Sequence, residues 1–325
     1  MLTKVNLITG FLGSGKTTSI KHLLSQKPDD EIWAVLVNEF GEIGIDGALL
    51  TDSGALIKEI PGGCMCCVNG LPMQVGLNML LQKKPHRLLI EPTGLGHPKQ
   101  ILSLLTAQAY QPWLQLQATL CLLDPRQLHD SRCMENENFR DQLAAADVIV
   151  ANKADTWQQD DRDALHQWYQ QHGRDRHLLR LTQGQLDLSV LDLARENHTE
   201  LPDGQHHHST STPKTGLAAL KLLGQERWRR ALNQGQGYAA CGWVFDSDTQ
   251  FDTVKLLEWV RLAPVSRVKG VMRIAEGTLV VNRQGFDLHI ETRQTPPPDS
   301  RIEIINEEQA QWNTLQKQLL DARLR

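Results

Sequence analysis

The chain has 325 residues, with 40% hydrophobic and 22% charged side chains and a formal net charge of -4. This length suits two domains of ordinary size, and the slightly acidic balance, without a basic run, excludes the charge pattern typical of nucleic-acid-binding proteins. No apolar run of about 18 residues predicts a membrane span. Because a strand pattern begins close to Met1, we expect no secretory signal peptide and a cytoplasmic location.

The first feature along the chain is a phosphate-loop motif. Residues 10–17 read Gly-Phe-Leu-Gly-Ser-Gly-Lys-Thr, match the pattern G-x-x-x-x-G-K-[ST], and follow an apolar strand pattern. The glycines of the loop are Gly10, Gly13 and Gly15. They let backbone N–H groups turn toward phosphate oxygens at the start of a helix. Lys16 is expected to reach the β- and γ-phosphates and the Thr17 hydroxyl to ligate Mg²⁺, so the loop predicts binding of a nucleoside triphosphate.

A second strand is predicted at residues 32–37, whose nearly continuous apolar character is typical of a parallel strand covered on both faces. It leads into the acidic, glycine-containing segment 38–46, at the strand end where open α/β sheets bind their ligands. Two interpretations of this segment remain, a mobile loop that responds to the nucleotide and an ordinary surface loop.

Three cysteines, Cys64, Cys66 and Cys67, fall within four consecutive positions. Such close neighbours are poorly placed for disulfides with one another, and thiols in a cytosolic protein stay reduced. We interpret them as ligands of a soft or borderline cation, with Zn²⁺ the first candidate and Cu(I) the second, and Glu39 or Glu42 available to complete the site. Redox sensing and structural burial are the alternative interpretations.

A further strand pattern, residues 87–90, ends in Glu91 and is followed three positions later by Gly94. This arrangement resembles the second acidic element of a nucleotide site. Glu91 is expected to hold Mg²⁺ through water or to place the attacking water, and the Gly94 N–H to sense the γ-phosphate.

The predicted strand at 147–151 ends in Asn152-Lys153-Ala154-Asp155. Asp155 can accept hydrogen bonds from the two N–H donors on the edge of guanine, which adenine does not present, while Asn152 and Lys153 brace the pocket. Because this motif follows the phosphate loop and the acidic strand end in order, the sequence favours GTP over ATP.

Four other residues with reactive side chains receive no predicted role in catalysis. Cys121, Cys133 and Cys241 stand alone and are expected to be small buried hydrophobic residues. His97 is expected at a helix cap or on the surface rather than as a metal ligand.

The fold predicted from these patterns is α/β, a P-loop NTPase with a doubly wound, mostly parallel sheet, followed by a smaller α+β domain. We assign residues 1–196 to the first domain, 197–235 to a connection and 236–325 to the second domain. Residues 197–216 are polar and contain His206, His207 and His208, so this linker either collects metal loosely or is merely solvated. The second domain is expected to serve partner recognition or oligomerisation, with stabilisation of the first domain as the alternative.

Taken together, these motifs resemble those of the CobW-type metallochaperone GTPases, a branch of the SIMIBI-class P-loop proteins. The matching segments are Gly10–Thr18, including Ser14 and Thr18, as phosphate loop, Asn38–Glu42 as first switch, Gly63–Cys67 with its Cys-x-Cys-Cys motif, Glu91–Gly94 as Walker B and second switch, and Asn152–Asp155 for guanine. Two positions depart from this pattern, because some relatives have Glu where Val37 stands and many have Asp where His97 stands.

The resemblance implies a GTPase that hydrolyses GTP slowly with Mg²⁺ and delivers Zn²⁺ to client metalloproteins, contacted through the switch region or a C-terminal CobW domain. It also implies metal- or nucleotide-linked self-association, and no nucleic-acid or membrane partner is expected. Along the sequence, the predicted thiol site lies between the two loops that should sense the γ-phosphate, so GTP hydrolysis could switch zinc from the bound to the released state. The rival functions are a GTP-dependent zinc store or sensor, an insertion GTPase for cobalt, nickel or iron, and a redox-regulated GTPase.

Overall fold

The computed structural model describes residues 2–38, 53–60, 71–196, 222, 226–235, 237–285 and 287–324, without the side chains of 71, 72 and 235. These residues form two compact units. The first contains the described residues up to 196, and the second contains those from 222 onward. Each unit has a sheet of its own.

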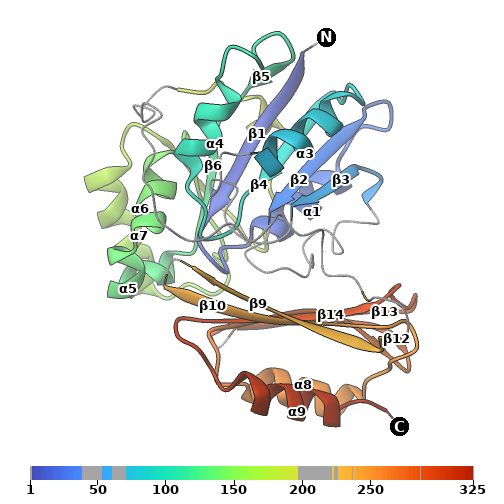
Figure 1. The fold of residues 1–325 in the computed structure, drawn as a ribbon. Coiled ribbons are helices and arrows are strands. Elements are labelled where there is room, and N and C mark those ends of the chain that lie inside the picture. The colour runs from blue at the N-terminus through green and yellow to red at the C-terminus, as the bar shows by residue number, and fades with distance from the viewer. Residues whose placement is uncertain are drawn as a thin grey trace. The chain divides into compact units, whose positions relative to one another are not determined.

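The first unit is built on a parallel sheet (Figure 1). Its described strands are β1 (Thr3–Gly10), β2 (Trp33–Asn38), β3 (Leu56–Ile60), β4 (Arg87–Glu91), β5 (Leu114–Leu116), β6 (Leu120–Leu123), β7 (Val148–Ala151) and β8 (His177–Arg180). The strand order is β3-β2-β4-β1-β6-β7-β8, and β5 also pairs with β1. Strands that follow β1 are thus added first on one side of it and later on the other. In doubly wound sheets this arrangement places the ligand at the carboxyl end of the strand where the direction reverses.

Helices cover both faces of this sheet. The helical elements described in the first unit are α1 (Lys16–Ser25), α3 (Leu71–Leu81), α4 (Pro98–Leu105), η2 (Pro125–His129), α5 (Ser131–Glu135), α6 (Glu137–Ala144), α7 (Gln159–His172) and η3 (Leu188–Asp192). Apolar residues of α3 and α4 pack on one face, and those of α1 and η3 pack on the other. Among the helices that the structure describes, none is long and apolar enough to span a membrane.

The apolar pattern of the sequence explains this packing. In β2, all residues from Trp33 to Asn38 are buried, because the strand is covered on both faces. In α1, Ile20, Leu23 and Leu24 recur at helical spacing and are at most 3% exposed. Burial of each such side chain contributes about 1.5–3 kcal/mol, so this stripe fixes the helix directly behind the phosphate loop.

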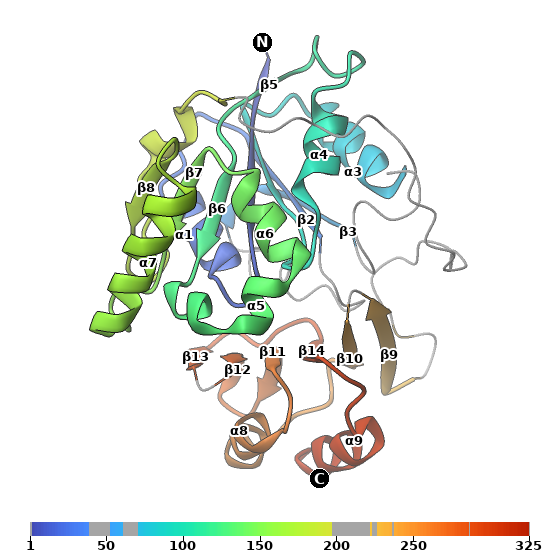
Figure 2. The ribbon, with the colours of Figure 1, turned by 90° about the vertical axis from the view of Figure 1, so that its left-hand side faces the viewer.

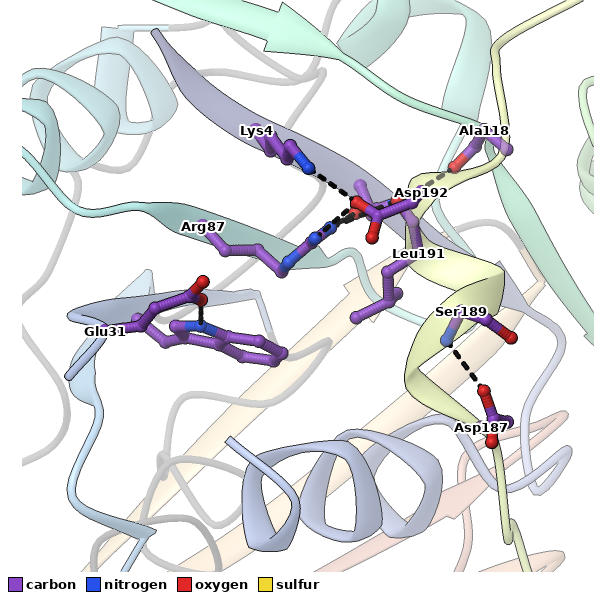
Figure 3. Close-up of polar contacts among 10 residues, drawn as sticks. Lys4, Glu31, Arg87, Ala118, Asp187, Ser189, Leu191 and Asp192 are labelled. Atoms are coloured by element: carbon purple, nitrogen blue, oxygen red, sulfur yellow. Dashed lines mark hydrogen bonds and ion pairs between the residues drawn. The ribbon is translucent and has the colours of Figure 1, made fainter. Parts of the chain in front are cut away.

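A polar network ties η3 to the amino-terminal ends of β1 and β4 (Figure 3). Arg87, only 6% exposed, donates hydrogen bonds to the Asp192 carboxylate at 2.7 Å and the Leu191 carbonyl at 3.1 Å. Lys4 donates to the same Asp192 oxygen at 2.8 Å. The guanidinium also lies 5.3 Å from the ring centroid of Trp33. The network therefore closes the end of the sheet opposite the phosphate loop.

The second unit contains an antiparallel sheet in the order β13-β12-β11-β14-β10-β9 (Figure 1). Its described elements are β9 (Trp228–Gly235), β10 (Tyr238–Phe245), α8 (Thr253–Leu262), β11 (Arg267–Ile274), β12 (Gly277–Gln284), β13 (Asp287–Arg293), β14 (Ser300–Asn306) and α9 (Trp312–Asp321). Residues of α8 and α9 form one apolar core with alternate residues of the strands, so both helices cover the same face of the sheet.

The predicted fold class is confirmed, an α/β P-loop unit followed by a separate unit with an antiparallel sheet. The sequence shows no clear strand pattern at β3, β5 and β9. Strand β9 lies within residues 197–235, the predicted connection, and its polar sequence Trp-Arg-Arg-Ala-Leu-Asn-Gln-Gly does not alternate clearly. As an edge strand it has a partner on only one side, so it needs less apolar surface than a central strand.

Candidate nucleotide-binding site

The phosphate loop connects the carboxyl end of β1 to the first turn of α1. Gly15 precedes the helix with φ 102°, in the left-handed region that residues with a Cβ rarely adopt. A Cβ at this position would lie 2.4 Å from Asn152 Nδ2. Glycine at this position therefore satisfies both the backbone geometry and the close approach of the Asn152 side chain, which follows β7.

Lys16 and Thr17 occupy the first turn of α1. The Lys16 side chain is 7% exposed, and its Nζ donates to the carbonyls of Gly10 at 2.9 Å and Phe11 at 3.4 Å. The ammonium group thus lies against the loop whose phosphate ligand it is predicted to bind. Thr17 Oγ1 donates to Glu91 Oε1 at 2.7 Å, although 74 residues separate the two positions.

The contact between Thr17 and Glu91 follows from the topology of the sheet. β1 and β4 are parallel neighbours, with Leu7 opposite Ile90, so both strands end at the same edge. The Glu91 side chain is 2% exposed. A carboxylate beside a hydroxyl at the start of a helix is a set of oxygen ligands suited to Mg²⁺.

The loop fits the phosphates of a nucleotide. The first N–H groups of α1 have no intrahelical partner, as at every helix start, and they carry the positive end of the helix dipole. Ser14 is buried, and its hydroxyl has no hydrogen-bond partner within the described part of the chain. Donors of this kind, together with the Lys16 ammonium, suit phosphate oxygens.

Gly94 lies directly against the phosphate loop. A Cβ at Gly94 would meet the Leu12 backbone nitrogen at 2.9 Å and its Cα at 3.0 Å. Only glycine allows this approach without displacement of one of the two backbones. The structure therefore places the predicted γ-phosphate sensor in contact with the loop that is predicted to hold the phosphates.

The predicted guanine motif follows β7 at the same edge of the sheet. Asn152 Nδ2 donates to the Ser14 carbonyl at 3.0 Å, and Asn152 Oδ1 accepts from the Gly184 N–H at 3.0 Å. Lys153 has φ 62°, and its Nζ lies 3.2 Å from Asp124 Oδ2. Asp155 is exposed to solvent. Asn152 thus joins the motif to the phosphate loop. The exposed Asp155 carboxylate is accessible to a base.

Two residues of this site were not predicted from the sequence, Asp124 and Gly184. Asp124 follows β6, its side chain is 6% exposed, and it pairs with both Lys153 and Arg126. Gly184, with φ 70°, lies in the loop after β8. Both follow parallel strands of the sheet, so their position at the carboxyl ends of strands was the available signal.

The predicted zinc ligands Glu39, Glu42, Cys64, Cys66 and Cys67 lie outside the described residues. Their assignment remains a prediction from the sequence, as does any metal binding by the histidines of the linker. Within the part of the chain that the structure describes, no group of three or more His, Cys, Asp or Glu side chains could hold a metal ion.

The isolated cysteines and His97 can be placed. Burial raises the pKa of both the Cys121 and the Cys241 thiol to about 12, so these side chains stay neutral, as expected for small hydrophobic residues. Cys133 is only half-buried, which differs from the prediction, because it lies in the short surface helix α5. His97 occupies the N-cap position of α4, in agreement with its expected place at a helix cap.

The fold and this site define a P-loop nucleotide-binding protein with a second, antiparallel-sheet domain. Residues 4–180 match the family model described as CobW/HypB/UreG, nucleotide-binding domain. Residues 240–323 match the cobalamin synthesis protein cobW C-terminal domain. The chain belongs to the CobW/HypB/UreG family.

Known proteins of this kind resemble the chain over different lengths. It is 66% identical to the zinc chaperone YeiR of Escherichia coli over 324 residues, which cover 99% of each protein. It is 32% identical over 189 residues to the zinc chaperone CobW of Pseudomonas aeruginosa, with 46% of this chain and 48% of the relative covered. The chain also aligns with a crystal structure of Zn(II)-bound YjiA GTPase from Escherichia coli. The alignment covers 100% of each chain, with 19% identity and a TM-score of 0.45.

Proposed function

We propose that the chain is a GTP-hydrolysing zinc chaperone, which couples GTP binding and hydrolysis to the transfer of Zn²⁺ to client proteins. The observation that supports the nucleotide half most directly is the 2.7 Å contact between Thr17 Oγ1 and Glu91 Oε1. It joins the two predicted Mg²⁺-binding elements, which are far apart in sequence. The zinc half is supported by the full-length relative that is named a zinc chaperone.

In this proposal the chain binds the triphosphate through backbone N–H groups of residues 13–18 and the Lys16 ammonium. Thr17 and Glu91 would hold Mg²⁺, which neutralises charge on the phosphates when it is bound. Glu91, buried and next to the loop, would orient the water that attacks the γ-phosphate. The Gly94 N–H would donate to an oxygen of that phosphate.

Selection of guanine is assigned to the exposed Asp155 carboxylate, which accepts two hydrogen bonds from the base edge. Asn152 keeps this motif at a fixed distance from the phosphates, because its amide bonds to the Ser14 carbonyl. Asp124 orients the Lys153 ammonium, whose aliphatic stem can then lie along the base.

Zinc is treated as cargo, bound by Cys64, Cys66 and Cys67 with Glu39 or Glu42. These residues lie in the sequence between β2 and α3, on either side of β3, and before the Gly94 loop. A nucleotide that orders the neighbouring loops would then change zinc affinity by a typical coupling of about 1–3 kcal/mol, or roughly 5–150-fold. Because the sequence identifies no arginine finger, we expect slow turnover until zinc, a client or a second copy completes the site.

The test measures zinc affinity by chelator competition, once with GDP and once with a non-hydrolysable GTP analogue. We expect the two affinities to differ by at least about 5-fold. The Lys16→Ala variant is the matched control, because it should lose the response to nucleotide while the thiols remain. Equal zinc affinities in the two nucleotide states of the wild-type protein would contradict the coupling.

A further inference from the structure

Helix α6 holds the loop that contains Gly94. Gln142 of this helix is 1% exposed, and its Nε2 donates to the carbonyls of Gly94 at 3.0 Å and Gly96 at 3.1 Å. One side-chain amide thus uses both of its N–H bonds on two carbonyls of the same short loop. Such a double contact fixes the orientation of the loop better than one hydrogen bond would.

The same helix also contacts the phosphate loop. Phe139 packs edge-to-face against Phe11, with ring centroids 5.5 Å apart and an angle of 90°. The contact is of the favourable edge-to-face kind between aromatic rings. Figure 2 shows α6 next to α4, the helix that follows the Gly94 loop. Residues Phe139 and Gln142 therefore connect both phosphate-facing loops to one rigid element.

A third contact links α6 to the start of α4. Asp141 Oδ1 lies 3.3 Å from Lys99 Nζ, and Asp141 Oδ2 lies 3.6 Å from His97 Nδ1. These side chains are roughly a quarter exposed, so water weakens their attraction. The buried Gln142 amide is consequently the stronger of the two ties between α6 and this region.

The hydrogen bonds described within this loop do not involve the Gly94 N–H. The Leu95 N–H bonds to Thr93 Oγ1 at 3.2 Å, and the Gly96 N–H bonds to the Thr93 carbonyl at 2.9 Å. Gln142 occupies the Gly94 and Gly96 carbonyls. The Gly94 N–H, in a buried residue, forms no hydrogen bond with any part of the chain that the structure describes. A buried N–H without a partner is unfavourable by roughly 1–3 kcal/mol, so this position points to a ligand.

We propose that Gln142 is a positioning residue that holds the Gly94 N–H ready for the terminal phosphate and so allows the protein to distinguish GTP from GDP. This inference rests on the proposed function. Because Gly94 lies against Leu12 of the phosphate loop, a small shift of the loop would move its N–H away from the phosphate position. GDP has no γ-phosphate, so its affinity does not depend on the two hydrogen bonds from Gln142 to the loop.

The test compares the affinity for a fluorescent non-hydrolysable GTP analogue with that for fluorescent GDP. In Gln142→Leu, which keeps the volume and removes the donors, we expect about a tenfold loss of analogue affinity, equivalent to roughly 1.4 kcal/mol, and unchanged GDP affinity. The ratio of the two affinities is the readout, since general destabilisation lowers both equally. An unchanged ratio in this variant would overturn the proposal.

Asn6→Leu is the matched control. Asn6 is fully buried in the same unit, and its Nδ2 also donates to two carbonyls, those of Ala118 and Leu191, both at 3.1 Å. It lies toward the opposite end of β1 from the phosphate loop. This variant should lower thermal stability and leave the affinity ratio unchanged. A ratio that moves as much as in Gln142→Leu would also overturn the proposal.

A second variant decides the matter if Gln142→Leu does not fold. Gln142→Glu has the same shape, but its ionised carboxylate repels both carbonyls, whereas its protonated form can donate one hydrogen bond. We expect the ratio of analogue affinity to GDP affinity to be low at high pH and to recover partly as the pH falls. A ratio that stays at the wild-type value at every pH contradicts the proposal. If the wild-type protein binds neither nucleotide, the proposed function itself fails, which is a different outcome.

Discussion

The side-chain amide of Asn152 donates a hydrogen bond to the backbone carbonyl of Ser14 at 3.0 Å, and this contact joins the predicted base motif to the phosphate loop. The two residues are 138 positions apart, in the loops that follow β7 and β1, the strands that flank β6 in the sheet. The other end of the same amide accepts from the Gly184 N–H. One side chain therefore sets the spacing of three loops at the carboxyl edge of the sheet.

The first prediction concerns the close approach at Gly15. In Gly15→Ala the new Cβ would lie 2.4 Å from Asn152 Nδ2, and the residue would keep a left-handed φ of 102°. We expect a stability loss of about 1–3 kcal/mol from the backbone strain alone, and at least a tenfold loss of GDP affinity because Asn152 must move. Calorimetric binding and thermal unfolding measure the two effects.

Gly237→Ala is the control for that experiment. Gly237 also has a left-handed φ, of 80°, but a Cβ there would meet no atom within 4 Å. This variant should therefore show backbone strain without any change in GDP affinity. Normal GDP binding by Gly15→Ala would mean that Asn152 does not hold the nucleotide site together.

The second prediction concerns the choice of base. Asp155 is exposed at the end of the base motif and accepts from the two N–H donors of guanine in the proposed function. In Asp155→Asn, an amide that can donate replaces one of the two acceptors. We expect GDP affinity to fall on the order of 100-fold and affinity for xanthosine diphosphate, which has a carbonyl at that edge, to rise. Competition titrations with the two nucleotides test this; an unaltered preference would remove Asp155 from the base site.

Much of the first unit could be predicted because its signals are local. The phosphate loop at residues 10–17 and the strand ends at Glu91 and Asn152 can each be recognised from a few consecutive residues. Parallel strands then bring their carboxyl ends to one edge of the sheet. The order of motifs along the chain was enough to expect this edge to carry the site. The described residues place Thr17 beside Glu91 accordingly.

The elements that could not be predicted depend on contacts distant in sequence. Strand β3, Leu-Ile-Lys-Glu-Ile, is a partly exposed edge strand with no regular alternation. Glutamine is usually exposed, yet Gln142 is buried and its partners lie 46 and 48 positions earlier in the chain. Nothing in the local sequence distinguishes a buried glutamine that bonds to a loop from an exposed one.

The third prediction concerns the pH dependence of stability at the Arg87 network. Hydrogen bonding from Lys4, followed by that from Arg87, lowers the pKa of Asp192 below its ordinary value. A carboxyl whose pKa is lower in the folded state adds stability above its unfolded pKa of about 3.9, and this is lost as the pH falls through the folded value. We therefore expect Asp192→Asn to cost about 1 kcal/mol at pH 7, a modest figure because the side chain is half exposed.

Urea unfolding of wild type and Asp192→Asn between pH 7 and pH 2 measures that difference. The two unfolding free energies should converge at the acidic end. Asp187→Asn is the comparison variant, because Asp187 accepts from the Ser189 N–H at the start of the same turn, which also lowers its pKa, but it is not part of the Lys4 and Arg87 network (Figure 3). A difference between wild type and Asp192→Asn that is constant with pH would show that the carboxylate charge is not responsible.

The fourth prediction concerns the isolated thiols. Burial raises the pKa of Cys121 and Cys241 to about 12, so at pH 8 both are neutral, and the thiolate is the form that reacts with alkylating reagents. Cys133 is half-buried and more accessible. We expect iodoacetamide to modify Cys133 at least tenfold faster than the other two in the folded protein, with equal rates for all three in urea. Peptide mapping by mass spectrometry separates these sites from the clustered cysteines. Rapid modification of Cys121 without urea would mean that the sheet at β6 opens far more often than the burial of Cys121 implies.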